Sequence, residues 1–370
     1  MQEWLLSLLR CPVCKGPLIY RTFDRTDAQG LLGHDSLGCD ELYPVINGIP
    51  RLLVGGARLG LVRSHRAWFN MSVETAALAE TWSKTGARNA LVAAFDDEWT
   101  HFRGVGTQDH SSVFKLYFDL VPWDHFRSDR LVIDAGCGAG RWAREVAMRG
   151  PRVVAVDLGN SIEIARANTP HNLVACVQAD LLALPLAPRA ADWAYSLGVL
   201  HHTNEPLKAL SNVVEVVKPG GLLLLYLYYA LDNRGAVFRG IFQAVDHARR
   251  LISRQPRPVA RALAAIIATS VYWPLARLAA GLERLGATRL ALHLPLSFYR
   301  HLSFETMRND SLDRFGTALE RRYTQKEMVQ LMTRGGLTRV AISDKSPLWH
   351  GVGVRAESGG ASEGDGGHEA

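Results

Sequence analysis

From Arg130 onward, apolar runs typical of strands alternate with segments in which apolar residues have helical spacing. Runs of residues typical of buried strands lie at 131–135, 152–157, 173–179, 191–197 and 221–229. Segments with apolar residues at helical spacing lie between them, near 139–149, 161–168 and 205–217. Strands that alternate with helices in this way predict a parallel sheet covered on both faces. After a long interruption, the pattern resumes with a helix at 324–335 and strands at 337–343 and 348–355.

The remaining segments differ from this core in pattern. Residues 1–54 form short strand-like runs, too few to bury a core unaided below about 60 residues. We therefore divide the chain into a small β region (1–54), an aromatic-rich helical lid or linker (55–128), the alternating core (129–229), a basic helical insertion (230–320), the end of the core (321–356) and a tail (357–370). The tail is Gly, Ser and acidic residues, so we expect it to be disordered.

Composition places the chain among globular proteins, since 48% of its residues are hydrophobic and 21% are charged. The five cysteines are odd in number and are not spread like a disulfide framework, which favours a reducing cytoplasm. The first ten residues lack a basic leader and a small-residue cleavage site, so we expect no signal peptide. The predicted location is the cytoplasm.

A glycine-rich loop, Asp134-Ala-Gly-Cys-Gly-Ala-Gly140, follows the first predicted strand. Glycine is needed where a turn is tight, and where backbone must approach a ligand without a Cβ in the way. Such a loop alone is equally consistent with a simple turn. However, the second strand ends in Asp157, which could accept ribose hydroxyls, and the third ends in Asp180 followed by Leu181. Ligands of open α/β sheets bind at this carboxyl edge.

These segments resemble, in order and spacing, the successive motifs of class I S-adenosylmethionine-dependent methyltransferases. The matching segments are Asp134–Gly140, Val154–Asp157, Gln178–Asp180, Asp192–His202 and Val217–Gly221. The resemblance implies an α/β fold with a Rossmann-like sheet of seven strands, the last one antiparallel, and a helical insertion after the fifth. A dinucleotide dehydrogenase is the rival, but its G-x-G-x-x-G fingerprint fits less well because Arg141 and Trp142 follow Gly140.

The same resemblance implies that S-adenosyl-L-methionine is the methyl donor. Its methionine part would be held by Asp134, Gly136, Gly138 and Gly140, its ribose by Asp157, and its adenine by Asp180 with Leu181. The donor site would also include Cys137, Leu158, Leu197 and Gly198.

His201 and His202 follow the fourth predicted strand and are the candidate catalytic residues. In methyl transfer the enzyme chiefly aligns the nucleophile and excludes water. A hydroxyl acceptor also needs a general base, and either histidine could be that base. Similar His-His segments occur in related enzymes with differing acceptors, so a structural role for both stays open.

The aromatic segment Phe95–Phe102 resembles one found before the glycine loop in some bacterial methyltransferases, where such helices cover the cofactor. The resemblance implies that Trp99 covers the methionine arm. Aromatic residues at helical spacing more often belong to a plain hydrophobic core, and this alternative stays open.

Cys11-Pro-Val-Cys14 is a suitable half-site for zinc, because two thiolates separated by two residues can share one tetrahedral ion. The stretches 9–18 and 42–53 resemble the small zinc-ribbon proteins that act as partners of RNA- and protein-modifying methyltransferases.

Zinc-binding members of that group carry a second Cys-x-x-Cys, whereas Ser36 stands where its first cysteine belongs. Two alternatives follow. Either Cys11, Cys14 and Cys39 hold zinc with His34 as the fourth ligand, or the ribbon keeps its fold without a metal.

The formal charge of +6 originates in the insertion. Residues 231–300 hold eleven arginines against three acidic residues, a local charge of +8. The uncharged stretch Ala262–Ala276 is shorter than the ~20 residues needed to span a bilayer and is broken by Pro274, so we expect no transmembrane helix. A basic and apolar combination is typical of peripheral association with an anionic membrane, or of a site for a phosphorylated or lipid-linked acceptor. A helical cap with solvated arginines is the alternative.

Nucleic acid is not favoured as a partner. The insertion contains no lysine, and the strands show no aromatic RNA-binding signature. Ser196-Leu-Gly-Val also replaces the Asn-Pro-Pro-Tyr type of signature found in amino-directed methyltransferases. We therefore predict methylation of an oxygen on a small-molecule, glycan or lipid-linked acceptor. An RNA or protein methyltransferase and an inactive cofactor-binding scaffold are the alternatives.

Overall fold

A seven-stranded sheet in the order β7-β6-β5-β8-β9-β11-β10 forms the centre of the computed structural model. The model describes residues 1–23, 25–26, 28–34, 38–84, 111–230, 232, 236–316, 320–345 and 349–357. The strands are β5 (Leu131–Ala135), β6 (Arg152–Asp157), β7 (Val174–Ala179), β8 (Ala191–Leu197), β9 (Val217–Tyr226), β10 (Leu337–Ile342) and β11 (His350–Arg355). Strands β5 to β9 pair in parallel, and β11 is antiparallel to both of its neighbours. The predicted sheet with an antiparallel last strand is confirmed.

The helices of the core lie where the apolar spacing predicts them. They are α7 (Arg141–Ala147), α8 (Ser161–Asn168), α9 (Pro206–Val216) and α15 (Gln325–Arg334), with 3-10 turns η3 (Leu181–Ala183) and η4 (Leu200–His202) after β7 and β8. Thr324 and Glu327 form a capping box that begins α15, and Pro206 occupies the first turn of α9. Strand β9 begins earlier than predicted, because Val217 pairs with Ala191 ahead of a shift in register.

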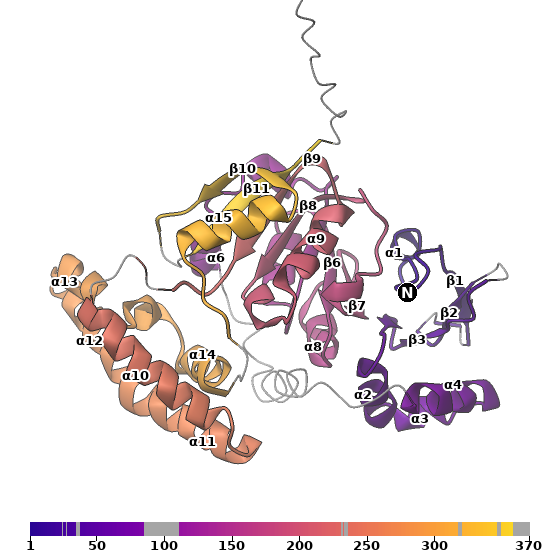
Figure 1. Cartoon of the computed structure of the whole chain (residues 1–370), viewed down its shortest axis with the longest axis horizontal. Helices are drawn as coiled ribbons and strands as arrows, with labels where there is room; N and C mark the ends of the chain where they lie inside the picture. Colours follow the sequence, from indigo (N-terminus) through magenta and orange to yellow (C-terminus); the bar gives the residue numbers. More distant parts are fainter. Residues whose placement is uncertain are drawn as a thin grey trace, which may run out of the picture.

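Helices cover the sheet on both faces, which explains why its strands are almost continuously apolar. In β6, Val153 and Ala155 belong to one hydrophobic cluster, and Val154 and Val156 belong to another. The first cluster includes residues of α7 and α8, and the second includes residues of α9 and α15 (Figure 1).

The N-terminal strands continue this sheet. They are β1 (Ile19–Thr22), β2 (Gly30–Gly33), β3 (Tyr43–Ile46) and β4 (Ile49–Leu52), preceded by the short helix α1 (Glu3–Leu6). They pair antiparallel with one another, and β4 then pairs in parallel with β7, with Arg51 opposite Gln178. Leu31 and Leu52 consequently share a hydrophobic cluster with Val177. This region obtains its core from its neighbour, as its small size requires.

Short helices connect this region to the central sheet. They are α2 (Ala57–Ser64), α3 (Arg66–Phe69), α4 (Val73–Ser83), α6 (Ser111–Tyr117) and the 3-10 turn η2 (Trp123–Phe126). The rings of Phe114 and Phe118 pack against Trp142 at the start of α7. Trp99, predicted to cover the cofactor, and almost all of the tail predicted to be disordered lie outside the described residues.

The insertion is helical, as predicted. Its elements are α10 (Ala236–Ile252), α11 (Arg257–Ile267), η5 (Ala268–Tyr272), α12 (Trp273–Arg284), α13 (Thr288–His293), η6 (Ser297–His301) and α14 (Phe304–Gly316). In Figure 1 these helices stand together on the left and the N-terminal strands on the right, with the sheet between them. A separate cluster that includes Tyr272, Tyr299 and Met307 forms the core of the insertion.

The expectation that Pro274 interrupts the uncharged stretch is wrong. Elements α11, η5 and α12 form one helix of 28 residues, Arg257–Arg284. The π-helical turn η5 lies directly before Pro274 and accommodates its ring, which would clash with a carbonyl in a regular α-helix. By length and composition this helix could cross a membrane, and only 28% of its most apolar window is buried in the protein.

Candidate active site

The glycine loop between β5 and α7 adopts a conformation that requires glycine. Gly136, Gly138 and Gly140 have φ values of 90°, 52° and 81°, in the left-handed region. A Cβ on Gly136 would lie 2.4 Å from Val199 Cγ2, and one on Gly140 would lie 2.9 Å from the Cα atom of Ala165. The glycines are therefore fixed both by the turn and by close packing.

Among the residues that the structure describes, none fills the space beside this loop at the carboxyl end of β8. Leu197 ends the strand, and Gly198 follows it with a φ of 79°. A Cβ on Gly198 would meet no atom within 4 Å. The next residue, Val199, is the one that contacts Gly136. The structure thus brings Leu197 and Gly198 to the glycine loop, as predicted.

Asp134 is a buried carboxylate at the start of this loop, with 2% of its surface exposed. Its Oδ2 atom makes no hydrogen bond to any residue that the structure describes. Burial raises the pKa of this carboxyl to about 8, and the charge of Asp157 acts in the same direction, while the Tyr195 hydroxyl opposes it. A buried acid of this kind is costly unless it pairs with a cation.

Asp157, at the end of β6, closes the glycine loop. Its Oδ2 accepts a hydrogen bond from Gly138 N at 2.9 Å, and its Oδ1 accepts from Gly159 N at 2.9 Å and Ser161 Oγ at 2.8 Å. The carboxylate is thus held in a fixed position at the carboxyl end of β6, beside the glycine loop. Burial raises the pKa of Asp157, and these donors lower it.

The other predicted donor-site residues lie at the same edge. Asp180 Oδ1 accepts a hydrogen bond from Leu182 N at 2.9 Å, and its neighbour Leu181 is buried. Cys137 is buried within the glycine loop. Leu158, half-buried, follows Asp157, and its carbonyl accepts a hydrogen bond from the Gln178 side chain at 3.1 Å. The sheet order therefore collects residues from four strand ends.

S-adenosyl-L-methionine fits this set of residues. Its methionine part carries a cationic amino group and a sulfonium, which would neutralise the unpaired carboxylate of Asp134. Glycines without a Cβ leave room for the backbone to approach a ligand. The fixed carboxylate of Asp157 suits a ribose hydroxyl, and Leu181 offers an apolar surface to a purine.

Both candidate catalytic histidines are buried in η4. The ring of His201 stacks on Tyr228 with centroids 4.0 Å apart, and the two histidine rings lie 4.1 Å apart. Neither ring nitrogen of His201 has a hydrogen-bond partner among the described residues. Burial holds the pKa of His201 well below its usual value, and the charges of His202 and Arg322 add to this effect. His201 is therefore a neutral imidazole.

The insertion brings a carboxylate to the second histidine. His202 Nε2 lies 3.8 Å from Asp313 Oδ1, which is an ion-pair distance rather than a hydrogen bond. The Tyr228 hydroxyl donates a hydrogen bond to the other oxygen, Asp313 Oδ2. Burial raises the pKa of Asp313, while His202 and Tyr228 favour its charged form. This contact joins η4, the segment directly after β9, and α14.

Tyrosines connect this histidine pair to the glycine loop. Tyr226 and Tyr228 lie 6.0 Å apart between ring centroids, and Tyr226 lies 5.3 Å from Tyr117. Tyr117 in turn packs on Trp142 in α7, at 5.0 Å. Arg314 of α14 lies close to Tyr272, Tyr299 and Tyr228, whose hydroxyls, with Glu320, raise its pKa. Hydroxyl-rich and charged side chains thus line the region between the donor site and the insertion.

Sequence reasoning missed Asp313, Arg314 and the tyrosines. A detectable signal was present, because Asp310, Asp313 and Arg314 recur at helical spacing with the apolar residues of α14. Ionisable residues on the buried side of a helix are unusual and point to a specific contact. Only the three-dimensional structure shows that Asp313 contacts His202.

The N-terminal region assembles the four residues predicted to bind metal. The side-chain ligand atoms of Cys11, Cys14, His34 and Cys39 all lie within 4.8 Å of one another. Cys11 Sγ is 4.0 Å from Cys39 Sγ, and Cys14 Sγ is 3.7 Å from His34 Nε2. Sulfur ligands of a tetrahedral zinc ion are about 3.8 Å apart, so these two distances match the spacing that zinc requires. Ser36 lies outside the described residues.

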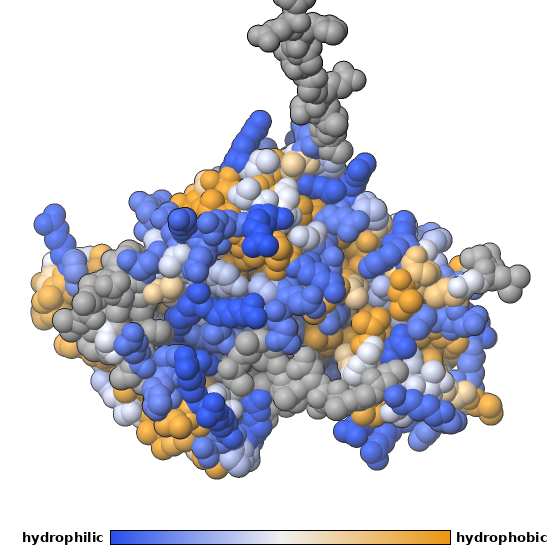
Figure 2. All heavy atoms as spheres, viewed as in Figure 1, coloured by the Kyte–Doolittle hydropathy of each residue, from blue (hydrophilic) through white to orange (hydrophobic). Residues whose placement is uncertain are grey.

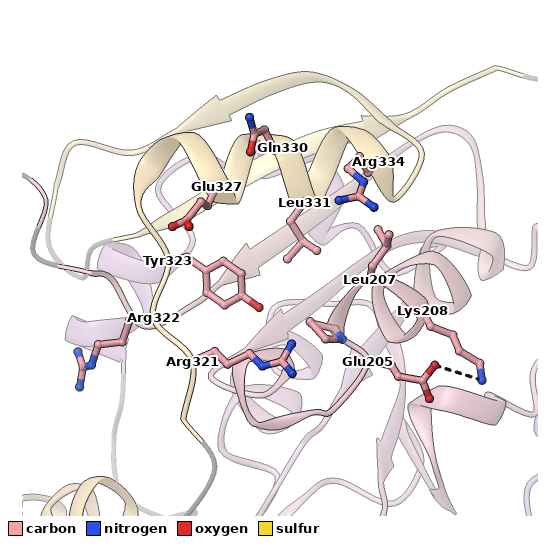
Figure 3. A pocket seen from close by; sticks show the side chains of 11 residues that line it. Glu205, Leu207, Lys208, Arg321, Arg322, Tyr323, Glu327, Gln330, Leu331 and Arg334 are labelled. Carbon is pink, nitrogen blue, oxygen red and sulfur yellow. Dashed lines mark ion pairs between the residues drawn. The ribbon is translucent and has the colours of Figure 1, made fainter. Parts of the chain in front are cut away.

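A separate groove of approximately 840 Å³ lies between α9 and α15 (Figure 3). Glu205 and Lys208 line one side of it and form an ion pair, and Arg334 lines the other. The groove contains none of the predicted donor-site residues. It is therefore distinct from the cofactor site.

Comparison with known proteins identifies the same region of the chain. Residues 133–225 match a family model described as a methyltransferase domain. A ubiquinone biosynthesis O-methyltransferase from Chromobacterium violaceum is 30% identical over 147 residues, which cover 38% of this chain and 60% of that protein. A malonyl-[acyl-carrier protein] O-methyltransferase from Enterobacter lignolyticus is 29% identical over 172 residues, covering 45% of this chain and 65% of that protein.

The match thus spans less than two thirds of either relative. Among solved structures, a magnesium protoporphyrin IX methyltransferase from Synechocystis PCC 6803 with bound SAH is similar to this chain. The superposed region covers 72% of this chain and 99% of the methyltransferase. Its identity is 14% and its TM-score is 0.42. Sheet order, glycine loop, strand-end carboxylates and family match agree that this chain carries a class I S-adenosylmethionine-dependent methyltransferase domain.

Proposed function

We propose that the chain transfers the methyl group of S-adenosyl-L-methionine to an oxygen of a small-molecule, glycan or lipid-linked acceptor. The observation that carries this proposal is the placement of His202 beside Asp313, at the sheet edge that holds the donor-site residues. A buried histidine next to a carboxylate is suited to accept the proton of a hydroxyl. Relatives named as O-methyltransferases support the same chemistry.

S-adenosyl-L-methionine supplies a methyl group on a positively charged sulfur. Asp134 and the glycine loop hold its methionine part, Asp157 its ribose, and Asp180 with Leu181 its adenine. Exclusion of water by the bound acceptor would favour attack by the acceptor oxygen over attack by water.

His202 acts as the general base. The acceptor hydroxyl gives its proton to His202 as its oxygen forms a bond to the methyl carbon, and the bond from that carbon to sulfur breaks. Asp313 stabilises the imidazolium that results, and Tyr228 holds Asp313 in position through its hydrogen bond. His201, neutral and stacked on Tyr228, supports this arrangement rather than taking the proton.

A labelling experiment tests the proposal. The full chain is incubated with methyl-tritiated S-adenosyl-L-methionine and with separate fractions of a host extract. Label in lipid, glycan or small-molecule fractions supports O-methylation when base releases it as methanol, as from an ester, or hydriodic acid releases it as methyl iodide, as from an ether. Label released by ribonuclease or protease would contradict the proposed acceptor class. Bound donor without transfer to any fraction would indicate an inactive scaffold.

We also propose that Cys11, Cys14, His34 and Cys39 bind one structural zinc ion. Support comes from the four ligand atoms within 4.8 Å and from backbone N–H groups directed at the sulfurs. Gly16 N lies 3.4 Å from Cys14 Sγ, and Val13 N lies 3.4 Å from Cys11 Sγ. Such donors stabilise thiolates, the form in which cysteine binds zinc. Zinc there would tie the turn at Cys11 and Cys14 to the segment that holds His34 and Cys39.

A further inference from the structure

The long helix Arg257–Arg284 of the insertion has two unlike faces. On its inner face, residues at four-residue spacing are buried; they are Ala260, Ala264, Ala268, Tyr272 and Ala276. Residues spaced by four lie on one side of a helix. This side packs against α14 in the insertion, through contacts such as Ala264 with Leu312. The inner face therefore belongs to the folded core of the insertion.

The outer face of the same helix is apolar and exposed. Val259, Ile266, Trp273 and Leu278 are each between 39% and 60% exposed. Exposed leucines of adjoining segments extend this surface; they are Leu251, Leu285, Leu290 and Leu292. Single exposed apolar residues are ordinary, but many of them on one segment indicate a binding surface. Figure 2 shows hydrophobic side chains along the outer edge of these helices, interleaved with hydrophilic ones.

Arginines border this apolar surface at both ends of the helix. Arg254, in the turn before α11, is exposed, and so are Arg284 in the last turn of α12 and Arg289 in α13. Glu283, next to Arg284 in the sequence, is engaged by Arg300 and His301. From Ala262 to Ala276 the helix carries no charge. The pattern is an apolar stripe between two cationic ends.

We propose that this outer face, from Leu251 to Leu292, docks on an anionic lipid surface. Apolar side chains of a helix that lies in the plane of a membrane enter the boundary between headgroups and acyl chains. Arginines beside them pair with anionic headgroups, and each contributes about 1 kcal/mol of attraction. Trp273 suits this position, since tryptophan is enriched at membrane interfaces.

The helix lies on the membrane rather than spanning it. Its inner face is already buried against α14, so spanning would require the insertion to unfold. Its uncharged stretch of fifteen residues is also shorter than the ~20 needed to cross the hydrocarbon core. A second copy of the chain fits the face poorly, because Arg254, Arg284 and Arg289 would meet arginines of the same surface.

Flotation with lipid vesicles tests the proposal on the full chain. We expect binding to phosphatidylcholine vesicles that contain about one third phosphatidylserine, and no binding to pure phosphatidylcholine vesicles. Binding should weaken when salt is raised from about 0.05 to about 0.5 M, because salt screens the headgroup charge. The triple variant R254Q/R284Q/R289Q should bind about a hundredfold more weakly.

The apolar contribution is tested with I266N/L278N, which should lower vesicle affinity by at least about tenfold. A matched control is V73N/M148N, which replaces two exposed apolar residues outside the insertion and should bind as the wild type does. Absence of binding to anionic vesicles at low salt would overturn the proposal. So would a dimer in lipid-free solution that I266N/L278N dissociates. Vesicle binding needs neither methyl donor nor acceptor, so its outcome is independent of methyl transfer.

Discussion

Arg51 and Gln178 join the N-terminal region to the cofactor site. Arg51, fully buried in β4, donates a hydrogen bond from Nη1 to Gln178 Oε1 at 2.9 Å, and it also pairs with Glu163 of α8. The Gln178 amide in turn donates to the carbonyl of Leu158, directly after Asp157. A line of hydrogen bonds therefore leads from the N-terminal strands to the expected ribose position. The N-terminal strands are therefore part of the same sheet as the methyltransferase domain and contact the residues next to its donor site.

Replacing Arg51 with methionine should destabilise the whole chain. Loss of one partner from a buried ion pair leaves Glu163 without its main cation and costs about 3 kcal/mol. The measurement is the free energy of unfolding from denaturant titration. The matched control is Arg21→Met in β1, whose partner Glu74 is exposed, and which should cost less than about 1 kcal/mol. Equal effects of the two variants would show that Arg51 does not join the regions.

Binding of S-adenosylhomocysteine should strengthen with pH. The raised pKa of Asp134, about 8, means that folding of the free chain favours its protonated form. The contribution of protonated Asp134 to the free energy of unfolding is present at low pH and is lost as the pH rises through about 8. The ligand's amino group needs the ionised carboxylate, so its affinity should rise about tenfold per pH unit between about pH 6 and 8.

Calorimetric titration over this pH range gives the slope. The variant Asp134→Asn should bind more weakly, with an affinity that no longer depends on pH in this window. A slope that persists in Asp134→Asn would assign the proton to another group.

The purified chain should contain about one zinc ion, held by the N-terminal cluster. Cys14→Ser should lower the zinc content to near zero, because it removes one of four ligands. The control is Cys176→Ala, a buried cysteine in β7 outside the cluster, which should keep its zinc. Elemental analysis of the proteins decides the matter, and a wild-type value near zero would contradict a metal site.

Asp313→Asn should reduce the rate of methyl transfer and leave the affinity for the methyl donor unchanged. Loss of the carboxylate beside His202 removes the stabilisation of its imidazolium, and general-base catalysis contributes about a hundredfold or more. Methyl transfer is measured on the extract fraction that accepts label, and S-adenosylhomocysteine affinity is measured alongside. Asp129→Asn, in an exposed ion pair with Arg127, is the matched control and should keep full activity. A parallel loss of donor affinity in Asp313→Asn would mean that Asp313 has only a structural role.

The sequence predicts the central fold well because each local signal there agrees with the final packing. The alternation of apolar strands and amphipathic helices places all seven strands, and the glycines of the loop have the positive φ values that their spacing suggests. Two features depend on contacts between distant segments and could not be predicted. One is the pairing of β4 with β7, which makes the N-terminal region part of the sheet.

The other is the position of α14 over η4. Asp313 and His202 are far apart in sequence, and no local pattern states which strand end a helix of the insertion will reach. The course of the helix through Pro274 was also missed, because a π-helical turn that accommodates proline has no clear signature in the sequence. The predicted role of Trp99 stays a prediction.

The most direct test of the account is the titration of S-adenosylhomocysteine against the wild-type chain and against Gly136→Ala. The wild type should bind about one ligand per chain, and it should not bind NAD. In Gly136→Ala, the added Cβ meets Val199 at 2.4 Å, so affinity should fall at least about tenfold. Gly286→Ala, strained by a similar φ of 82° but in open space, should bind normally. Undetectable binding by the wild type, or equal affinity in Gly136→Ala, would contradict the assignment of this loop as the donor site.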